Sequence, residues 1–294
     1  MRVVAVVGPT ATGKSDLGLA LAEALGGEVV NADSMQLYQG MDIGTAKLTP
    51  TERRGIPHHL LDVWDVRVTA TAAAYQRLAR DVLGDLLARG VQPVVVGGSG
   101  LYVRAALDAV EFPGTDPTLR RSLEAELAEH GPAALHERLR ALDPEAAGRM
   151  EPSNGRRIVR ALEVVLLTGA MPGALTTYAE HLPTDYVGLD RPDLAERVAT
   201  RVDRMWDVGL VEEVAGLDGL REGVTARRAL GYAQALAQLD GELSDEQARA
   251  STVAATRRFV RRQRAWFRRD PRVRWLAPAD DLVSQALAVV GRRD

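Results

Sequence analysis

The chain has 294 residues, 46% hydrophobic and 26% charged, with a net charge of −3, a composition typical of a soluble globular protein with a full core. The absence of cysteine excludes disulfides, thiolate catalysis and cysteine-based zinc sites. The apolar start at Val3 to Val7 is too short for a signal-peptide core, and no stretch approaches a membrane span, so we expect a cytoplasmic protein without a membrane partner.

The first hundred residues alternate strands and helices. The β-branched run Val3 to Val7 predicts a buried parallel strand, and further strands are expected at 28–33 and 94–96. Helices are expected at 15–25, stopped by Gly26 and Gly27, and at 71–89. This order predicts an α/β fold: a P-loop NTPase-like parallel sheet with helices on both faces and a site at the carboxyl ends of its strands.

The pattern changes after Pro113. Charged helical stretches follow at 119–140 and 156–167, and the next strand is expected at 186–189. We therefore predict a core formed by residues 1–111 and 183–294, interrupted by a helical insertion domain at 112–182. Residues 190 to about 269 are predicted to form a helical C-terminal region.

The stretch Gly8-Pro9-Thr10-Ala11-Thr12-Gly13-Lys14-Ser15 fits the phosphate-binding loop pattern, between a predicted strand and a predicted helix. Its backbone N–H groups would hold phosphate oxygens, Lys14 would add charge, and the Ser15 hydroxyl suits Mg²⁺. Of 37 Lys and Arg residues only Lys14 and Lys47 are Lys. A phosphate loop needs such a flexible point charge, because a planar guanidinium does not fit there.

Two features near the predicted strand ends have several interpretations. A kinase or NTPase needs a strand-terminal Asp to organise Mg²⁺, but the strand at 94–96 runs into Gly97-Gly98-Ser99. Asp33 ends the other strand, and the sequence leaves open a metal-site, helix-capping or general-base role. For His58 and His59 a packing or loop-orienting role is favoured over metal binding, because adjacent side chains diverge.

The segment from Arg257 to Arg274 contains nine Arg and one Asp, although the whole chain is acidic. On a helical wheel this segment has an apolar arc, expected to face the core, and an opposite arc of arginines. The apolar arc is Phe259, Val260, Gln263, Trp266 and Phe267. The opposite arc is Arg257, Arg258, Arg261, Arg262, Arg264, Arg268 and Arg269. Further basic points are Arg120-Arg121, Arg156-Arg157, Arg160 and Arg227-Arg228. Each fits a solvated surface, but together they indicate a path for a nucleic acid.

These motifs together resemble the tRNA dimethylallyltransferases, also called tRNA isopentenyltransferases, over nearly the whole chain. Besides the phosphate loop, the resemblance rests on Asn31-Ala-Asp-Ser-Met-Gln36, Gly40-Met-Asp-Ile-Gly-Thr-Ala-Lys47, Pro57-His-His-Leu60, Gly97-Gly-Ser-Gly-Leu-Tyr102, Arg157-Ile-Val-Arg-Ala-Leu-Glu-Val164, Asp190-Arg191, Gly231-Tyr232 and the segment Thr256 to Trp266. The phosphate loop occurs in many families, whereas Asp33-Ser-Met-Gln36 and the terminal Arg-Gln…Trp segment are more particular.

The resemblance implies transfer of a dimethylallyl group from its diphosphate to N6 of the adenosine at tRNA position 37, immediately 3′ of the anticodon, with release of diphosphate. The implied partners are a tRNA anticodon stem-loop and dimethylallyl diphosphate, the cofactor is Mg²⁺, and we expect a monomer. A small-molecule kinase would leave the Arg-rich helix unexplained. A non-catalytic RNA-binding module would leave Lys14 and Asp33 without a role.

The resemblance also implies roles for individual residues. The charge of the departing diphosphate would be neutralised by Lys14, by Ser15 with Mg²⁺, and by Arg201 in preference to Arg197. Asp33 would accept the amine proton. Ser99 stands where the family more often has Thr, and it keeps the hydroxyl. The implied tRNA-binding set is Asp33, Ser34, Met35, Gln36, Ser99, Arg120, Arg156, Arg157, Arg160, Arg228, Gly231, Tyr232, Arg257, Arg261, Arg262 and Gln263. Two positions depart from the family, Arg156 in place of Gln and Ala265 in place of Thr.

Overall fold

The computed structural model of the chain describes residues 1–172 and 177–291. It separates the chain into two compact units, one formed by Met1–Ala109 and Ala179–Asp294 and the other by Val110–Tyr178. The bounds of the second unit lie within a few residues of the insertion expected at 112–182. The first unit is called the core unit below and the second the insertion unit.

A parallel sheet of six strands forms the centre of the core unit, in the order β3-β2-β4-β1-β5-β6. β1 and β4 lie in the middle, where their valines are almost fully buried, as expected for strands covered on both faces. The strands are β1 (Val3–Val7), β2 (Gly27–Asn31), β3 (His58–His59), β4 (Gln92–Gly97), β5 (Thr184–Leu189) and β6 (Val273–Leu276).

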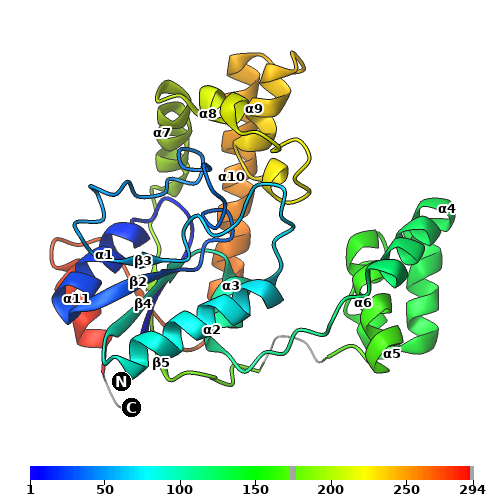
Figure 1. Ribbon diagram of the computed structural model, residues 1–294, viewed down its shortest axis with the longest axis horizontal. Helices are drawn as coiled ribbons and strands as arrows, with labels where there is room; N and C mark the ends of the chain where they lie inside the picture. Colours follow the sequence, from blue (N-terminus) through cyan, green and yellow to red (C-terminus); the bar gives the residue numbers. More distant parts are fainter. Residues whose placement is uncertain (173–176, 292–294) are drawn as a thin grey trace. The chain divides into compact units, whose positions relative to one another are not determined.

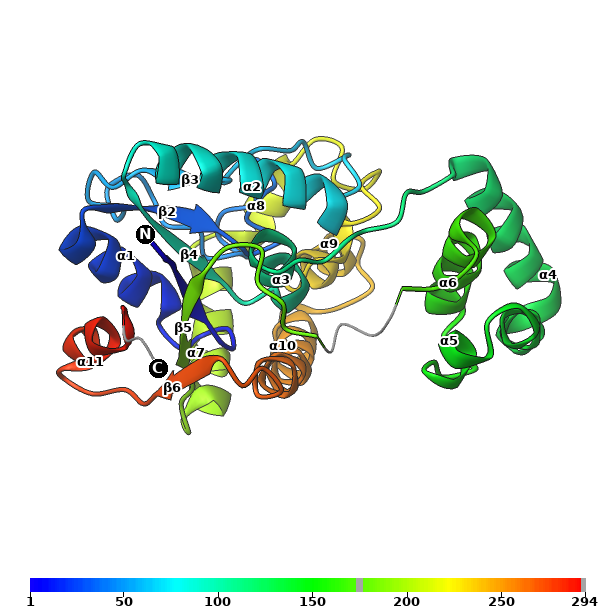
Figure 2. The ribbon, with the colours of Figure 1, turned by 90° about the horizontal axis from the view of Figure 1, so that it is seen from below.

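Helices cover both faces of this sheet (Figure 2). α1 (Lys14–Leu25) and α11 (Leu282–Val289) pack on one face, where Leu17, Leu21 and Ala286 join the strand valines in one hydrophobic cluster. α2 (Ala72–Ala88) and α3 (Gly100–Leu107) lie on the other face. The Thr71 side chain caps α2 by accepting a hydrogen bond from Ala74 N, which explains where this predicted helix begins.

The C-terminal helices form a second hydrophobic cluster of the core unit, and Figure 1 shows them together beyond the sheet. They are α7 (Leu194–Asp207), α8 (Leu210–Gly216), the 3₁₀ turn η1 (Ala226–Arg228), α9 (Tyr232–Leu239) and α10 (Asp245–Phe267). α7 follows β5 directly and therefore begins at the carboxyl end of the sheet. Buried side chains of α7, α8 and α9 pack there with Tyr38 and Met41 from the long connection after β2.

The insertion unit is helical, with α4 (Pro117–Leu142), α5 (Pro144–Gly148) and α6 (Gly155–Thr168) around its own core. The stretch predicted as one helix over 119–140 is broken at Gly131, which has φ 76° and precedes Pro132. Proline removes a backbone donor and its ring clashes with the preceding turn, so the helix cannot continue through this point.

Among the described residues, several short elements were not individually expected from the sequence, including β3, β6, α3, α5 and α11. β3 has two residues and β6 four, and both are edge strands that gain their conformation from one neighbour each.

Among the residues described, no helix combines the length and apolar character needed to cross a bilayer.

Candidate active site

The phosphate loop, residues 8–15, connects β1 to α1, and Gly8, Ala11 and Gly13 have positive φ. Gly8 has no room for a side chain, because a Cβ atom there would lie 2.3 Å from Leu189 O of β5. Gly13 precedes α1, so the unpaired N–H groups of the first helical turn lie at the loop. Lys14 Nζ donates to Pro9 O at 2.5 Å, within the loop that its charge would serve.

A cavity of about 650 Å³ lies at the carboxyl ends of the strands. The loops and helices that follow β1, β2, β4 and β5 all contribute to its wall, so the sheet topology brings together residues far apart in the sequence. Its lining includes the phosphate-loop residues Thr10, Ala11, Gly13, Lys14 and Ser15, then Asp33 and Gln36, Gly97 and Gly98, and the α7 residues Arg197, Arg201 and Arg204.

The cavity concentrates positive charge against the phosphate loop. Burial lowers the pKa of Lys14 to about 8, Asp33 acts to raise it and Arg201 acts to lower it. Burial also lowers the pKa of the Arg201 guanidinium, which Asp33 opposes. Arg201 Nη1 donates to Thr10 Oγ1 at 3.1 Å and Arg197 Nε donates to Ala11 O at 2.9 Å. Both arginines proposed from the sequence therefore reach the loop, and Arg201 is the less exposed of the two.

Asp33 follows β2 and lines the cavity. Its Oδ1 accepts a hydrogen bond from Met35 N at 2.9 Å, and its own N–H donates to Asn31 Oδ1 at 2.8 Å. These bonds form a local turn and no helix begins there, so helix capping does not explain Asp33. Its carboxylate is fixed in direction by the turn and shares the cavity with Lys14 and Arg201.

Three further predicted residues lie beside Asp33. Ser99 Oγ accepts from Ser34 N at 3.1 Å and donates to Ser34 Oγ at 3.2 Å, which ties the turn after β2 to the turn after β4. Gln36 Nε2 donates to Thr45 O at 3.1 Å. Asp33 and Gln36 therefore line the cavity, and Ser34 and Ser99 are bonded to each other next to Asp33.

Oxygen donors suited to Mg²⁺ are available from Ser15 and Asp33, which line the same cavity. The described part of the chain contains no group of three His, Asp or Glu side chains that could hold a metal by itself. A Mg²⁺ site does not require such a group, because this ion often takes one or two protein ligands and completes its shell with phosphate oxygens and water. His58 and His59 lie in β3, where His59 Nε2 pairs with Glu28 Oε2 at 2.6 Å, a packing role.

The arginines from Arg257 to Arg268, in the last turns of α10 and directly after it, divide into two groups. Arg264 and Arg268 both bind the Asp190 carboxylate, at 2.7 Å and 2.9 Å, and this ion pairing fixes α10 to the end of β5. Arg257, Arg258, Arg261 and Arg262 are exposed, with Arg257 donating to Ala195 O and Arg262 stacked over Phe259. The exposed group, defined here as the α10 basic face, remains available to a polyanion.

Gln263 requires a correction. The sequence-based assignment places it on tRNA, but its side chain is buried and both ends of its amide are bonded inside the core unit. Nε2 donates to Gly98 O at 2.9 Å, and Oε1 accepts from Thr10 N at 3.0 Å. Gln263 therefore connects α10 to the phosphate loop and to the turn after β4, and its burial leaves this internal bridge as the role that the structure supports.

The assignment of Gly231 and Tyr232 to tRNA contact is corrected in the same way. Both residues are buried, and Tyr232 OH donates to Glu213 Oε1 at 2.5 Å. The tyrosine ring packs against Gly44, where a Cβ atom would lie 2.3 Å from the ring. These two residues support the connection after β2, while Arg228 next to them is exposed.

In the insertion unit, two of the predicted RNA-contacting arginines are ion-paired. Arg120 and Arg160 both bind Glu163, whose side chain is fully buried. Burial raises the pKa of Glu163, but the hydrogen bonds and charges of the two arginines outweigh it and lower the pKa. Arg120 and Arg160 thus have a structural role in this unit, while Arg121, Arg156 and Arg157, which were also named as basic points, are exposed.

The segment Gly40–Leu48 supplies wall residues that the sequence does not identify as part of the site. Thr45, Ala46 and Leu48 line the cavity. Thr45 and Ala46 lie within the family motif Gly40–Lys47, and Leu48 follows it directly, but none of the three was assigned to the site. The rarity of lysine could have drawn attention to this segment, since Lys47 is one of only two lysines in the chain.

The chain matches the family model described as IPP transferase over residues 36–270. Curated relatives named tRNA dimethylallyltransferase, from Thermobifida fusca and Streptomyces coelicolor, are 63% and 62% identical. The alignments cover 98% and 99% of this chain and 94% and 96% of the relatives.

Solved structures give the same relationship. The tRNA isopentenylpyrophosphate transferase of Bacillus halodurans is 37% identical with a TM-score of 0.71, and the match covers 98% of this chain and 94% of that one. A eukaryotic dimethylallyltransferase acting on tRNA is 25% identical with a TM-score of 0.81, covering 98% of this chain and 77% of the other.

The pKa of Lys14 leads to a pH dependence of anion binding. Sulfate keeps its charge over the range from about pH 6 to about pH 10, so its affinity should fall as the pH rises through about 8 and Lys14 loses its proton. The bound anion favours the charged amine, so the midpoint in the complex lies above that of the free protein. The measurement is isothermal titration with sulfate at several pH values.

Lys14→Met is the matched control for this titration. It should bind sulfate weakly and with little pH dependence over the same range, because the remaining arginines stay protonated. A wild-type affinity that is constant with pH would contradict the assignment of Lys14 as the titrating cation.

Proposed function

Because this chain belongs to the IPP transferase family, we propose that it transfers a dimethylallyl group from dimethylallyl diphosphate to N6 of the adenosine at tRNA position 37, 3′ of the anticodon, and releases diphosphate. The observation that supports this most is the shared cavity of the phosphate loop, Arg201 and Asp33. Such a cavity presents cations to a diphosphate and a carboxylate to an acceptor. We further propose that the chain works as a monomer in the cytoplasm.

In this proposal the held phosphates are the leaving group. The adenine N6 lone pair forms a bond to the allylic carbon as the carbon–oxygen bond breaks, and the bonding electrons leave with the diphosphate. Lys14, Arg201 and Arg197 lie where they can neutralise that charge as it develops. No phosphoryl group moves, which agrees with β4 running into Gly97 and Gly98 instead of an Asp.

Asp33 is the proposed general base of this reaction. An exocyclic amine must lose a proton as its new bond to carbon forms, and the proton passes to the Asp33 carboxylate. Ser34 follows Asp33 and is bonded to Ser99, and Gln36 lines the same cavity, so these residues would offer polar groups to an adenine edge. The phosphate loop sits across the same cavity, so donor and acceptor would meet between them.

Mg²⁺ is the proposed cofactor. Ser15 would contribute its hydroxyl oxygen, and the diphosphate would supply further oxygens. When bound, the ion would add positive charge beside the leaving group.

Access to the target amine requires the adenosine to leave its stack, at a cost of about a few kcal/mol. Contacts between RNA phosphates and the α10 basic face would offset this cost, since Arg is suited to bidentate phosphate binding. Exposed Arg156 and Arg157 of the insertion unit and exposed Arg228 are proposed to add further contacts.

The direct test is incubation of the protein with Mg²⁺, radiolabelled dimethylallyl diphosphate and unmodified tRNA. Label should appear in the tRNA at N6-dimethylallyladenosine, identified by nucleoside mass spectrometry, and diphosphate should be released in equal amount. A tRNA with another base at position 37 is the control and should stay unlabelled. ATP consumption without RNA labelling would overturn the proposal in favour of a kinase.

Removal of the proposed base separates binding from chemistry. Asp33→Ala should retain tRNA binding and lose turnover by about two orders of magnitude or more, because the amine proton has no acceptor. Asp81→Ala, which removes an exposed carboxylate of α2, is the control and should keep normal turnover. A near-normal single-turnover rate for Asp33→Ala would exclude Asp33 as the base.

The α10 basic face can be tested through salt dependence. Arg261→Ala should weaken tRNA binding and reduce the slope of log affinity against log salt by about one, with little change in pyrophosphate affinity. Arg89→Ala is the matched control, since Arg89 follows α2 near the amino ends of the strands, away from the cavity. An unchanged slope for Arg261→Ala would show that this arginine does not contact RNA.

A further inference from the structure

Lys47 is a buried lysine without a place in the mechanism above. Its side chain is 2% exposed, and it does not line the cavity. The chain uses Arg at nearly every other basic position, so a lysine here indicates a site with a particular geometry.

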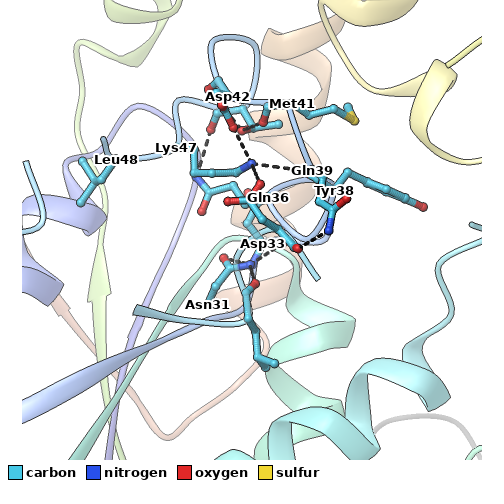
Figure 3. Close-up of polar contacts among 12 residues, drawn as sticks. Asn31, Asp33, Gln36, Tyr38, Gln39, Met41, Asp42, Lys47 and Leu48 are labelled. Atoms are coloured by element: carbon cyan, nitrogen blue, oxygen red, sulfur yellow. Dashed lines mark hydrogen bonds and ion pairs between the residues drawn. The ribbon is translucent and has the colours of Figure 1, made fainter. Parts of the chain in front are cut away.

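Three oxygens accept hydrogen bonds from the Lys47 ammonium. Nζ donates to Tyr38 O at 2.9 Å and to Asp42 Oδ1 at 2.6 Å, two residues labelled beside Lys47 in Figure 3. It also donates to Asp62 Oδ1 at 2.6 Å. An ammonium has three donors, so every one is satisfied. A planar guanidinium presents five donors in a fixed fork and cannot reproduce this arrangement.

These bonds fix the segment Gly40–Leu48 at one point, and Glu213 fixes it at another. Glu213 Oε2 accepts from Asp42 N at 3.1 Å and from Ile43 N at 2.7 Å, while its Oε1 binds Tyr232 OH. The segment is therefore held from two sides, by Lys47 within it and by α8 and α9 beside it.

The segment Gly40–Leu48 places Thr45, with its backbone carbonyl, at the cavity wall. Thr45 O accepts from Gln36 Nε2 at 3.1 Å and from Arg201 Nη2 at 3.5 Å. It is thus shared by a residue near Asp33 and by the buried arginine of the phosphate site. A displacement of Thr45 would release both side chains together.

We propose that Lys47 is a positioning residue of the active site, which fixes Thr45 O and through it orients Arg201 toward the diphosphate and Gln36 toward the acceptor base. This proposal depends on the proposed function only in calling the two ligands a diphosphate and an acceptor base. The contacts themselves run from the Lys47 ammonium to the segment Gly40–Leu48, and from Thr45 O to Arg201 and Gln36.

The test uses pyrophosphate binding to the whole protein, which does not depend on prenyl transfer. Lys47→Met keeps the length of the side chain but removes its charge and donors, and it should weaken pyrophosphate binding about tenfold, within the range of coupling between side chains that share partners. Arg201→Ala should also weaken it. The double variant should bind no more weakly than Arg201→Ala alone, because Lys47 acts through Arg201.

A second variant covers the case in which Lys47→Met does not fold. Asp62→Asn removes one anionic partner that is 40% exposed and leaves the buried ammonium with its other two. A smaller loss, about two- to threefold, is expected, and it should again vanish in the Arg201→Ala background. Asp85→Asn, on α2, is the control and should leave binding unchanged.

Two results would overturn the proposal: wild-type pyrophosphate affinity in the variants, or losses that add fully to that of Arg201→Ala, which is what general destabilisation gives. Failure of the RNA-labelling assay with intact coupling to Arg201 would reject the prenyl-transfer proposal alone. Normal labelling without coupling would reject the role of Lys47 alone.

Discussion

The placement of two partly buried cations, Lys14 and Arg201, in one cavity is the interaction on which the site depends. Both are desolvated, the charge of Arg201 lowers the pKa of Lys14, and Asp33 is the carboxylate that opposes the shift of each. Two cations held together in this way favour the binding of a dense anion between them. The parallel sheet makes this possible, because its strand ends bring the connections that follow β1, β2 and β5 to one edge.

Much of the fold and the centre of the site follow from local rules. The phosphate loop, the strands around it and the helix caps are specified by short patterns, and the structure confirms them at β1, α1 and α2. The position of Asp33 beside the loop also follows, since parallel neighbouring strands end at the same edge. Such features need only residues close in sequence and the topology of the sheet.

The remaining features depend on partners that no short pattern identifies. Gln263 lies on the predicted apolar arc of its helix, yet its bonds go to Gly98 and Thr10, 165 and 253 residues away. The family resemblance implies a tRNA contact for Tyr232, but in the structure this residue is buried beside Glu213 and Gly44. The short strands β3 and β6 have little pattern of their own, because neighbouring strands determine them.

The bridge made by Gln263 connects two places where ligands would bind, the arginines on the outer side of α10 and the phosphate loop on its inner side. The helix presents arginines outward and, through one amide, holds the backbone of the phosphate loop. A polyanion whose binding shifts α10 would therefore change the affinity of the loop for an anion, and an anion at the loop would change the affinity for the polyanion by the same factor. The stiffness of this one glutamine bridge then sets how strongly binding at the two places is coupled.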